Sequence, residues 1–158
     1  MRILEKTFSH IEDGRAHMVD ISGKADVFRR AKAIGEIVLS EDTIQKIQKG
    51  AVEKGNVLAT ARVAAVLAVK HTPDTIPMCH QIPITGIDVD FEIGAEVISV
   101  EVEVKTMGKT GVEMEALAGV AAALLTVWDM VKSVEKDESG NYPHTTIRNI
   151  RVLEKVKG

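Results

Sequence analysis

The sequence predicts an α+β fold of the ferredoxin-like, split βαβ type, a sandwich in which two helices cover one face of an antiparallel sheet. Three observations predict it: a hairpin of strongly alternating residues at 87–105, a long apolar helix directly after it at 111–132, and a strand followed by a helix before it. The resulting order is strand, helix, strand, strand, helix, strand, with a short extra helix after the first strand.

Length and composition indicate one globular domain. A chain of 158 residues can bury a hydrophobic core without the help of disulfides or metal ions, and a net charge of −3 favours neither disorder nor a nucleic-acid-binding surface. Only Phe91 places an aromatic ring on a predicted strand, which is too little for an RNA-binding sheet. One cysteine, Cys79, excludes an internal disulfide and indicates a reducing compartment. The charged amino terminus and the short apolar stretch at residues 116–130 predict a cytoplasmic protein without a membrane partner.

The first part of the chain contains an arm, a strand and two helices. Residues 1–14 are polar and without periodicity, which predicts a mobile amino-terminal arm before a single domain at residues 15–158. Residues 17–22 are a short extended candidate, and Ile and Val make residues 31–39 a strand.

Two predicted helix caps mark the starts of helices between residues 40 and 70. Ser40 is a predicted N-cap for a short helix that ends before Gly50. Asn56 is a predicted N-cap for a second, largely buried helix at residues 57–70, which Pro73 stops. Residues 75–83 contain two prolines and no period, so they are a loop.

The second part begins with the hairpin. Residues 87–93 and 100–105 alternate apolar with charged side chains, so one face should pack on the core and the other should be wet and acidic. Residues 111–132 are apolar in the middle and charged only at the ends, which predicts a helix enclosed by the sheet or by a neighbouring chain. Residues 135–143 are a polar connection, and residues 145–155 are a last strand.

Lys54 is the first of four candidate features, each of which also has a structural interpretation. It lies directly before a helix amino terminus, where free N–H groups and the helix dipole attract anions. The same field disfavours an ammonium, so a partly desolvated Lys54 would have a lowered pKa and could serve as general acid or base. Alternatively, it is a solvated turn residue.

The loop at Met78, Cys79 and His80 is the second feature. Zinc is disfavoured because the chain has one cysteine and no paired histidine spacing. A histidine-activated thiol would require the two side chains to converge in space. Ligand contact by His80 is better supported.

The last two features lie at the ends of the long helix. Residues 108–111 resemble a phosphate loop but lack its spacing. A more modest anion-binding nest is the alternative there, although Glu113 and Glu115 would repel phosphate. These glutamates suit hydrogen bonds to an N–H-rich ring such as guanine or a pterin, or simply place favourable charge at a helix start. Asp129 and Lys132 share a helical face, either as a surface ion pair or as a lysine tuned by a carboxylate.

Taken together, these stretches resemble the cyclic pyranopterin monophosphate synthase family of molybdenum cofactor biosynthesis (protein C family). The resemblance is carried, in order and spacing, by HMVDISGKADVFRRA, KGNVLATARVAAVLAVKHT, TIPMCHQI, TGVEMEAL and LTVWDMVKSV. It covers residues 16–155. The family usually has Asp where this chain has Asn56, and commonly Pro where it has Gln81.

The resemblance implies a catalytic domain that is ferredoxin-like and assembles as a hexamer, a trimer of dimers. It implies a lyase of the phosphorus–oxygen type, which converts cyclised dihydro-GTP to cyclic pyranopterin monophosphate and releases pyrophosphate. No resident cofactor or metal is expected, although Mg²⁺ could accompany the triphosphate.

The resemblance also implies roles for individual residues. Lys54 and Lys132 match the general acid and base, with Asp129 beside Lys132. Substrate-binding positions are implied at Asp20, Lys24, Arg29, Met78, Cys79, His80, Glu113, Met114, Glu115 and Lys155. Because Glu113 and Asp129 stand about 24 Å apart along a straight helix, we expect a composite site that combines two subunits or chain segments. The alternative is a ferredoxin-like nucleotide-binding regulatory module without turnover.

Overall fold

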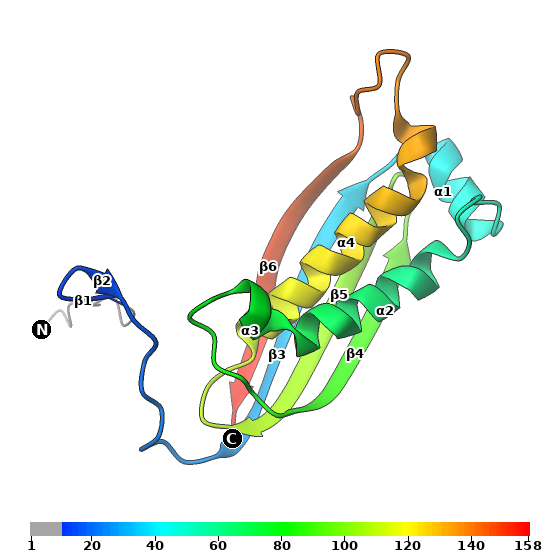
Figure 1. The fold of residues 1–158 in the computed structure, drawn as a ribbon. Helices are drawn as coiled ribbons and strands as arrows, with labels where there is room; N and C mark the ends of the chain where they lie inside the picture. Colours follow the sequence, from blue (N-terminus) through cyan, green and yellow to red (C-terminus); the bar gives the residue numbers. More distant parts are fainter. Residues whose placement is uncertain (1–10) are drawn as a thin grey trace, which may run out of the picture.

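A computed structural model describes residues 11–158. The predicted arm at residues 1–14 lies mostly outside the described residues; within it, β1 (Ile11–Glu12) pairs with β2 (Arg15–Ala16) in a small hairpin. Residues 17–22 are described, and they join no strand, contrary to the prediction of an extended segment. Their carbonyl oxygens accept from side chains instead, that of Val19 from His80 and that of Ser22 from Lys109. In Figure 1 the β1-β2 hairpin lies away from the main sheet and its helices.

In the described part of the chain, four strands form the main antiparallel sheet, in the spatial order β4-β5-β3-β6. They are β3 (Val27–Val38), β4 (Ile84–Ile93), β5 (Val97–Gly108) and β6 (Thr146–Lys157). Helices α2 (Val57–Lys70) and α4 (Glu113–Glu135) cover one face of this sheet, as Figure 1 shows. The order and the layering confirm the predicted ferredoxin-like α+β fold.

The predicted caps set the starts of the shorter helices. Ser40 Oγ accepts a hydrogen bond from the Thr43 N–H at 3.3 Å at the start of α1 (Glu41–Gln48). Asn56 Oδ1 accepts one from the Ala59 N–H at 2.9 Å at the start of α2. After α2, the single turn α3 (Thr72–Thr75) carries a proline in its first turn, where a missing N–H costs nothing.

The core lies between α2, α4 and the two central strands. Val100, Val102 and Val104 on β5 are fully buried, because every second side chain of the strand faces the helices. Gly119 lets α4 approach closely: a Cβ there would lie 2.9 Å from Val69 Cγ2 and 3.0 Å from Val102 Cγ1. The apolar middle of α4 is therefore core, as predicted.

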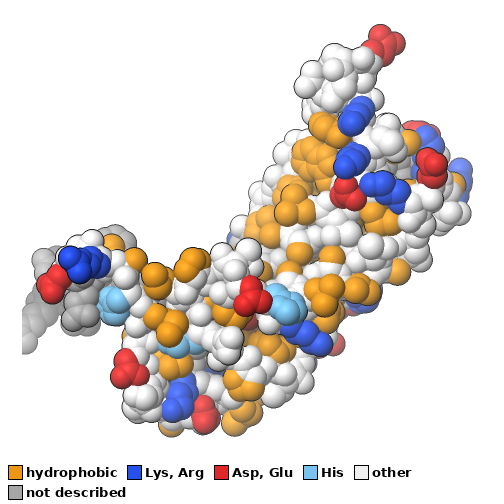
Figure 2. Space-filling model, in the orientation of Figure 1, with side chains coloured by type: hydrophobic (Ala, Val, Ile, Leu, Met, Phe, Trp, Pro, Cys, Tyr) orange, Lys and Arg blue, Asp and Glu red, His pale blue; other side chains and the backbone are white. Residues whose placement is uncertain are grey.

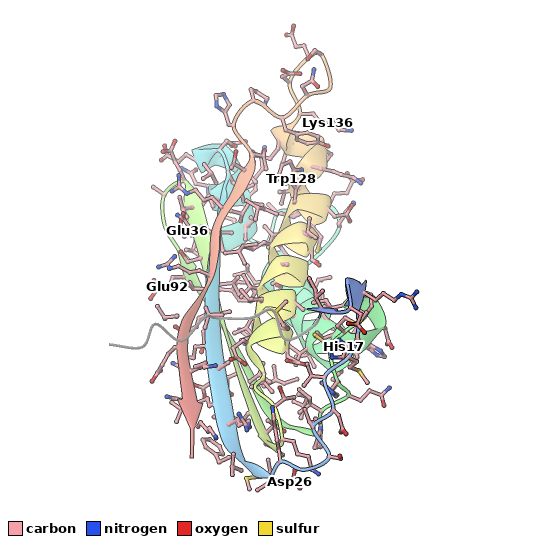
Figure 3. All side chains as sticks on the ribbon, turned by 90° about the vertical axis from the view of Figure 1, so that its left-hand side faces the viewer. His17, Asp26, Glu36, Glu92, Trp128 and Lys136 are labelled. Carbon is pink, nitrogen blue, oxygen red and sulfur yellow. The ribbon has the colours of Figure 1, made fainter. Side chains whose placement is uncertain are left out.

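The opposite face of the sheet is open and charged. The acidic face predicted for the hairpin is correct for β5, but cations from β3 and β5 neutralise it. Lys32 Nζ lies 2.9 Å from Glu101 Oε1, and Lys105 Nζ lies 2.8 Å from Glu103 Oε1. Figure 3 shows Glu36 on this side, away from the helices.

Several element boundaries differ from the prediction, and those of β3, β6 and α4 affect the interpretation. β3 begins at Val27 rather than residue 31, so exposed Phe28 also lies on a strand, whereas Phe91 packs against the core. β6 runs two residues further than predicted. α4 ends at Glu135, which was expected in the polar connection; its side chain is buried, 8% exposed, and its carboxylate has partners.

α4 is long and apolar enough to cross a membrane by length and composition alone. It has 23 residues, more than the stretch at residues 116–130 on which the sequence argument rested. Half of its most apolar window is buried inside the protein, and a buried core helix passes the same test.

Candidate functional site

The predicted site residues form two clusters at opposite ends of α4. Asp129, Lys132 and Lys54 lie at the carboxyl end, which we call the lysine cluster. Most of the predicted binding residues lie at the amino end. Figure 3 shows the span, with Asp26 at the lower end of the molecule and Trp128 near the upper end. Along α4 the clusters are about 24 Å apart, so they do not meet around one reacting centre within a chain.

The lysine cluster is held by one carboxylate. Lys54 Nζ donates to Asp129 Oδ2 at 3.1 Å and to the Asp129 carbonyl oxygen at 2.9 Å. Lys132 Nζ lies 2.8 Å from Asp129 Oδ1. Lys54 comes from the loop between α1 and α2, and the next residue, Gly55, has a φ of 104° that side chains rarely adopt. The fold thus joins residues that are 75 positions apart.

Charge pairing sets the protonation states in this cluster. Hydrogen bonds from Lys132 and Lys54, with their charges, lower the pKa of Asp129. The hydrogen bond and the charge of Asp129 raise the pKa of Lys132, which keeps it a cation able to donate a proton. The side chain of Lys54 is 46% exposed, so the desolvation proposed from the sequence is not present in the single chain.

The carboxyl end of α4 is anchored on both sides of the cluster. Trp128 packs edge-on against Tyr142, with ring centroids 5.4 Å apart. The buried Glu135 carboxylate accepts hydrogen bonds from the Ser40 N–H, the Ser40 hydroxyl and the Thr145 hydroxyl at 3.1, 2.8 and 2.6 Å. These contacts tie α4 to α1 and to the start of β6.

A cavity of about 380 Å³ lies at the amino end of α4, and we call it the ring cavity. Its volume suits a small organic ligand. Seven of the predicted binding residues line it: Lys24, Met78, Cys79, His80, Glu113, Met114 and Glu115. The structure thus brings together side chains that the sequence places in three separate segments.

Burial changes the chemistry of two groups in the ring cavity. Glu115 is 2% exposed, and this burial raises the pKa of its carboxyl group. Burial, with the charge of Glu115, also raises the pKa of the Cys79 thiol. A raised pKa suppresses the thiolate, so Cys79 is suited to contact a ligand rather than to attack it.

The amino-terminal segment forms one wall of the ring cavity through Val19 and Ile21. His80 Nε2 donates to the Val19 carbonyl oxygen at 2.6 Å, and Lys109 Nζ donates to the Ser22 carbonyl oxygen at 2.9 Å. Asp20 is exposed, and its carboxylate accepts from the Ser22 N–H at 2.8 Å. The structure thus places Asp20 in a turn beside the cavity.

A second cavity, of about 520 Å³, adjoins the first and shares Lys24, Thr110, Gly111 and Glu113 with it. We call it the cationic cavity, because five cations line it: Lys24, Arg29, Lys109, Lys155 and Lys157. Arg29 donates to the carbonyl oxygens of Gly108 and Lys109 at 2.9 and 3.1 Å, which fixes it in the wall. Such a lining suits a polyanion such as a phosphate chain.

Sequence reasoning did not assign two of these cations, Lys109 and Lys157, to substrate binding. Lys109 lies in the glycine-containing loop whose phosphate-loop spacing fails, and that loop does face the cavity. Lys157 lies two residues after Lys155 on β6, so strand alternation could have placed both on one face.

No group of three or more His, Cys, Asp and Glu side chains within residues 11–158 is placed to hold a metal ion. The expectation that the chain carries no resident metal stays a prediction. The arrangement thus offers two lysines on one carboxylate, which could exchange protons, a half-open cavity that could hold a ring, and positive charge that suits a polyanion.

Known proteins share this sequence over nearly its whole length. Residues 18–158 match the model of the MoaC family. A protein of Methanosarcina mazei named probable cyclic pyranopterin monophosphate synthase is 77% identical over 155 residues, 98% of this chain and 99% of that protein. Proteins of the same name are 74% identical in Methanosarcina acetivorans, over 100% of both chains, and 56% identical in Pyrococcus horikoshii, over 94% of both.

Proposed function

The chain belongs to the MoaC family, and we propose that it is a cyclic pyranopterin monophosphate synthase of molybdenum cofactor biosynthesis. Such a lyase converts cyclised dihydro-GTP to cyclic pyranopterin monophosphate with release of pyrophosphate. The observation that carries the proposal is the lysine cluster, in which Lys54 and Lys132 share the Asp129 carboxylate. The reaction opens and recloses a purine-derived ring system, so it needs several proton transfers and no redox centre.

The lysine cluster is suited to these transfers. The raised pKa of Lys132 keeps it protonated while Asp129 contacts it, which is the state that a general acid starts from. A substrate that displaces Asp129 or excludes water would lower the pKa of Lys132 and allow it to act as a base. The two ammonium groups are close enough to a common carboxylate to serve one reacting centre.

The two cavities suit the two parts of the substrate. The ring cavity would hold the purine-derived ring, with the buried Glu115 carboxyl group as a hydrogen-bond partner. The cationic cavity would hold the triphosphate, and Mg²⁺ could enter with it. Residues Lys24 and Glu113 line both cavities, so one ligand can span them.

The complete site would be composite. The ring cavity and the lysine cluster are about 24 Å apart along α4, which a single substrate cannot bridge in a productive geometry. We therefore propose that the lysine cluster of one subunit meets the cavities of another, in a hexamer built as a trimer of dimers. Val63, Leu67 and Leu125 on the outer faces of α2 and α4 are 60%, 52% and 61% exposed, as expected of surfaces that a neighbouring subunit covers. Figure 2 shows hydrophobic side chains over the middle of this helix face, between charged ends.

Turnover tests the catalytic assignment. We expect Lys132→Ala and Lys54→Ala each to slow pyrophosphate release from cyclised dihydro-GTP by about 10²–10⁴-fold, the usual contribution of a general acid or base. Lys136→Ala is the matched control, because this exposed lysine directly follows α4. Normal rates in both cluster variants would contradict the mechanism. Binding of the precursor without turnover by the native protein would favour the regulatory module instead.

Complementation tests the composite site. Glu115→Gln alters the ring cavity and Lys132→Ala the lysine cluster, so each homo-oligomer should be inactive. In mixed oligomers formed by co-expression, about a quarter of the sites would combine an intact cavity with an intact cluster if assembly is random. Activity should therefore return in verified mixed oligomers. An absence of recovery there would count against sharing across the interface.

A further inference from the structure

Glu113 stands where the ring cavity and the cationic cavity meet. Of the described residues that line the cationic cavity, it is the one carboxylate among five cations. Glu113 Oε1 lies 2.6 Å from Lys155 Nζ. Of these five cations, Lys155 alone forms an ion pair within the described part of the chain. Glu113 thus already neutralises a charge that a phosphate chain would need.

The carboxylate of Glu113 also occupies the start of α4. It folds back over Gly111, where a Cβ would lie only 1.9 Å from Oε2, so a side chain at position 111 would displace this carboxylate. The N-cap residue of α4 is Val112, whose side chain makes no capping hydrogen bond. The Glu113 carboxylate therefore sits at the positive end of the helix dipole, the place that an anionic ligand would otherwise take.

Glu113 competes there as an anion. Burial by itself would raise the pKa of its carboxyl group, but the hydrogen bonds from Lys155 and from its own N–H, with the charges of Lys155 and Arg29, lower it overall. The group is thus charged at neutral pH.

We propose that Glu113 is an internal competitor of the phosphate chain, which yields Lys155 and the amino end of α4 when the substrate binds and reclaims them when pyrophosphate leaves. The inference rests on the proposed function, because that reaction supplies both the triphosphate and the pyrophosphate. Glu113 thereby limits how tightly the product is held, and it favours release.

This exchange requires only Lys155 and Glu113 to move, because two of the other cations are held in place. Arg29 stays on the carbonyl oxygens of Gly108 and Lys109, so it offers charge without leaving the wall. Lys109 is held on the Ser22 carbonyl oxygen. The Lys155 side chain is 68% exposed, near the end of the edge strand β6, and can turn from the carboxylate to a phosphate without repacking the core.

Calorimetric titration with inorganic pyrophosphate tests the proposal on the full chain, in the presence of a chelator so that no metal bridges the anions. We expect Glu113→Gln to bind pyrophosphate about tenfold more tightly than the native protein, because one repelling charge next to the ligand is gone. Glu41→Gln is the matched control: it also removes a carboxylate from the first turn of a helix, α1, and should leave the affinity unchanged.

A second variant shows whether the competition runs through Lys155. In a Lys155→Gln background the native pairing is absent, so Glu113→Gln should gain clearly less than tenfold. In steady-state turnover, Glu113→Gln should lower KM and kcat together, since the substrate binds better and the product leaves more slowly. A merely structural role would instead raise KM.

Unchanged or weaker pyrophosphate binding in Glu113→Gln, with a native circular dichroism spectrum, would overturn the proposal. So would the lack of measurable binding in both proteins, because no phosphate would then occupy the cavity. Turnover of the native protein is measured separately. If the native protein fails to release pyrophosphate from the precursor while Glu113→Gln still tightens pyrophosphate binding, the proposed function is wrong and the competition stands.

Discussion

Glu135 is the residue whose replacement should most clearly separate folding from chemistry. Its carboxylate is 8% exposed and accepts hydrogen bonds from the Ser40 N–H, the Ser40 hydroxyl and the Thr145 hydroxyl. The perturbation is Glu135→Ala, which leaves these donors without their acceptor, and Glu135→Gln, which keeps the shape but removes the charge.

The magnitude follows from these contacts. A hydrogen bond to a charged group contributes about 1.5–3 kcal/mol, so three of them set an upper limit near 9 kcal/mol. The loss should be smaller, because the Ser40 hydroxyl keeps its bond to Thr43 Oγ1 at 2.9 Å and water can reach the vacated space. We expect Glu135→Ala to lower the free energy of unfolding by about 3–5 kcal/mol and Glu135→Gln by about 1–2 kcal/mol.

The lowered pKa of Glu135 predicts how its contribution to stability changes with pH. Burial by itself raises the pKa of Glu135, but the hydrogen bonds from Thr145, Thr43 and Ser40 lower it below the unfolded value. A group whose folded pKa is lowered stabilises the protein above its unfolded pKa, and this contribution is lost as the pH falls through the folded pKa. The difference in unfolding free energy between the native protein and Glu135→Gln should be constant from about pH 6 to 8 and shrink below about pH 4.

Urea denaturation at a fixed protein concentration measures these differences, because oligomers unfold at concentration-dependent midpoints. Glu138→Ala, in the exposed connection after α4, is the control and should change the unfolding free energy by less than about 0.5 kcal/mol. A Glu135→Ala loss as small as that of the control would refute the reasoning. A Glu135→Gln difference that does not shrink as the pH falls from 7 to about 3 would refute the electrostatic part.

Two further substitutions test the packing and the capping. Gly35→Ala on β3 would place a Cβ 2.7 Å from Val120 Cγ1, so the free energy of unfolding should fall by about 1–3 kcal/mol. Gly23→Ala is the control for the same denaturation assay. Its Cβ would meet nothing within 4 Å, so the stability should not change. Asn56→Ala removes the cap on the Ala59 N–H and should cost about 1 kcal/mol, and Asn56→Asp should restore the stability; equal stability of all three Asn56 forms would contradict the role of the cap.

Local patterns were sufficient for most elements, because the forces that define them act over a few residues. The alternation around Gly94 predicts the β4-β5 hairpin, and the side chains of Ser40 and Asn56 mark the starts of α1 and α2. Element ends were less certain. β3 extends to Val27 and α4 to Glu135 because β5 and the hydroxyls of neighbouring segments offer partners there, which no local pattern records.

The sequence predicted which residues are candidates for the site better than it predicted how they are arranged in space. The sequence by itself determined the family, because the spaced motifs around Lys54, His80, Glu115 and Lys132 identify it, and helix rise alone separates the two ends of α4. The roles of these residues stay predictions.

Only the tertiary structure decided how these residues meet. Lys54 reaches Asp129 across 75 positions, Lys155 reaches Glu113 across 42, and Lys109 and Lys157 join the cationic cavity. Such contacts depend on how helices pack on a sheet and on the register of β6 against β3, and both arise from the whole core rather than from any one segment.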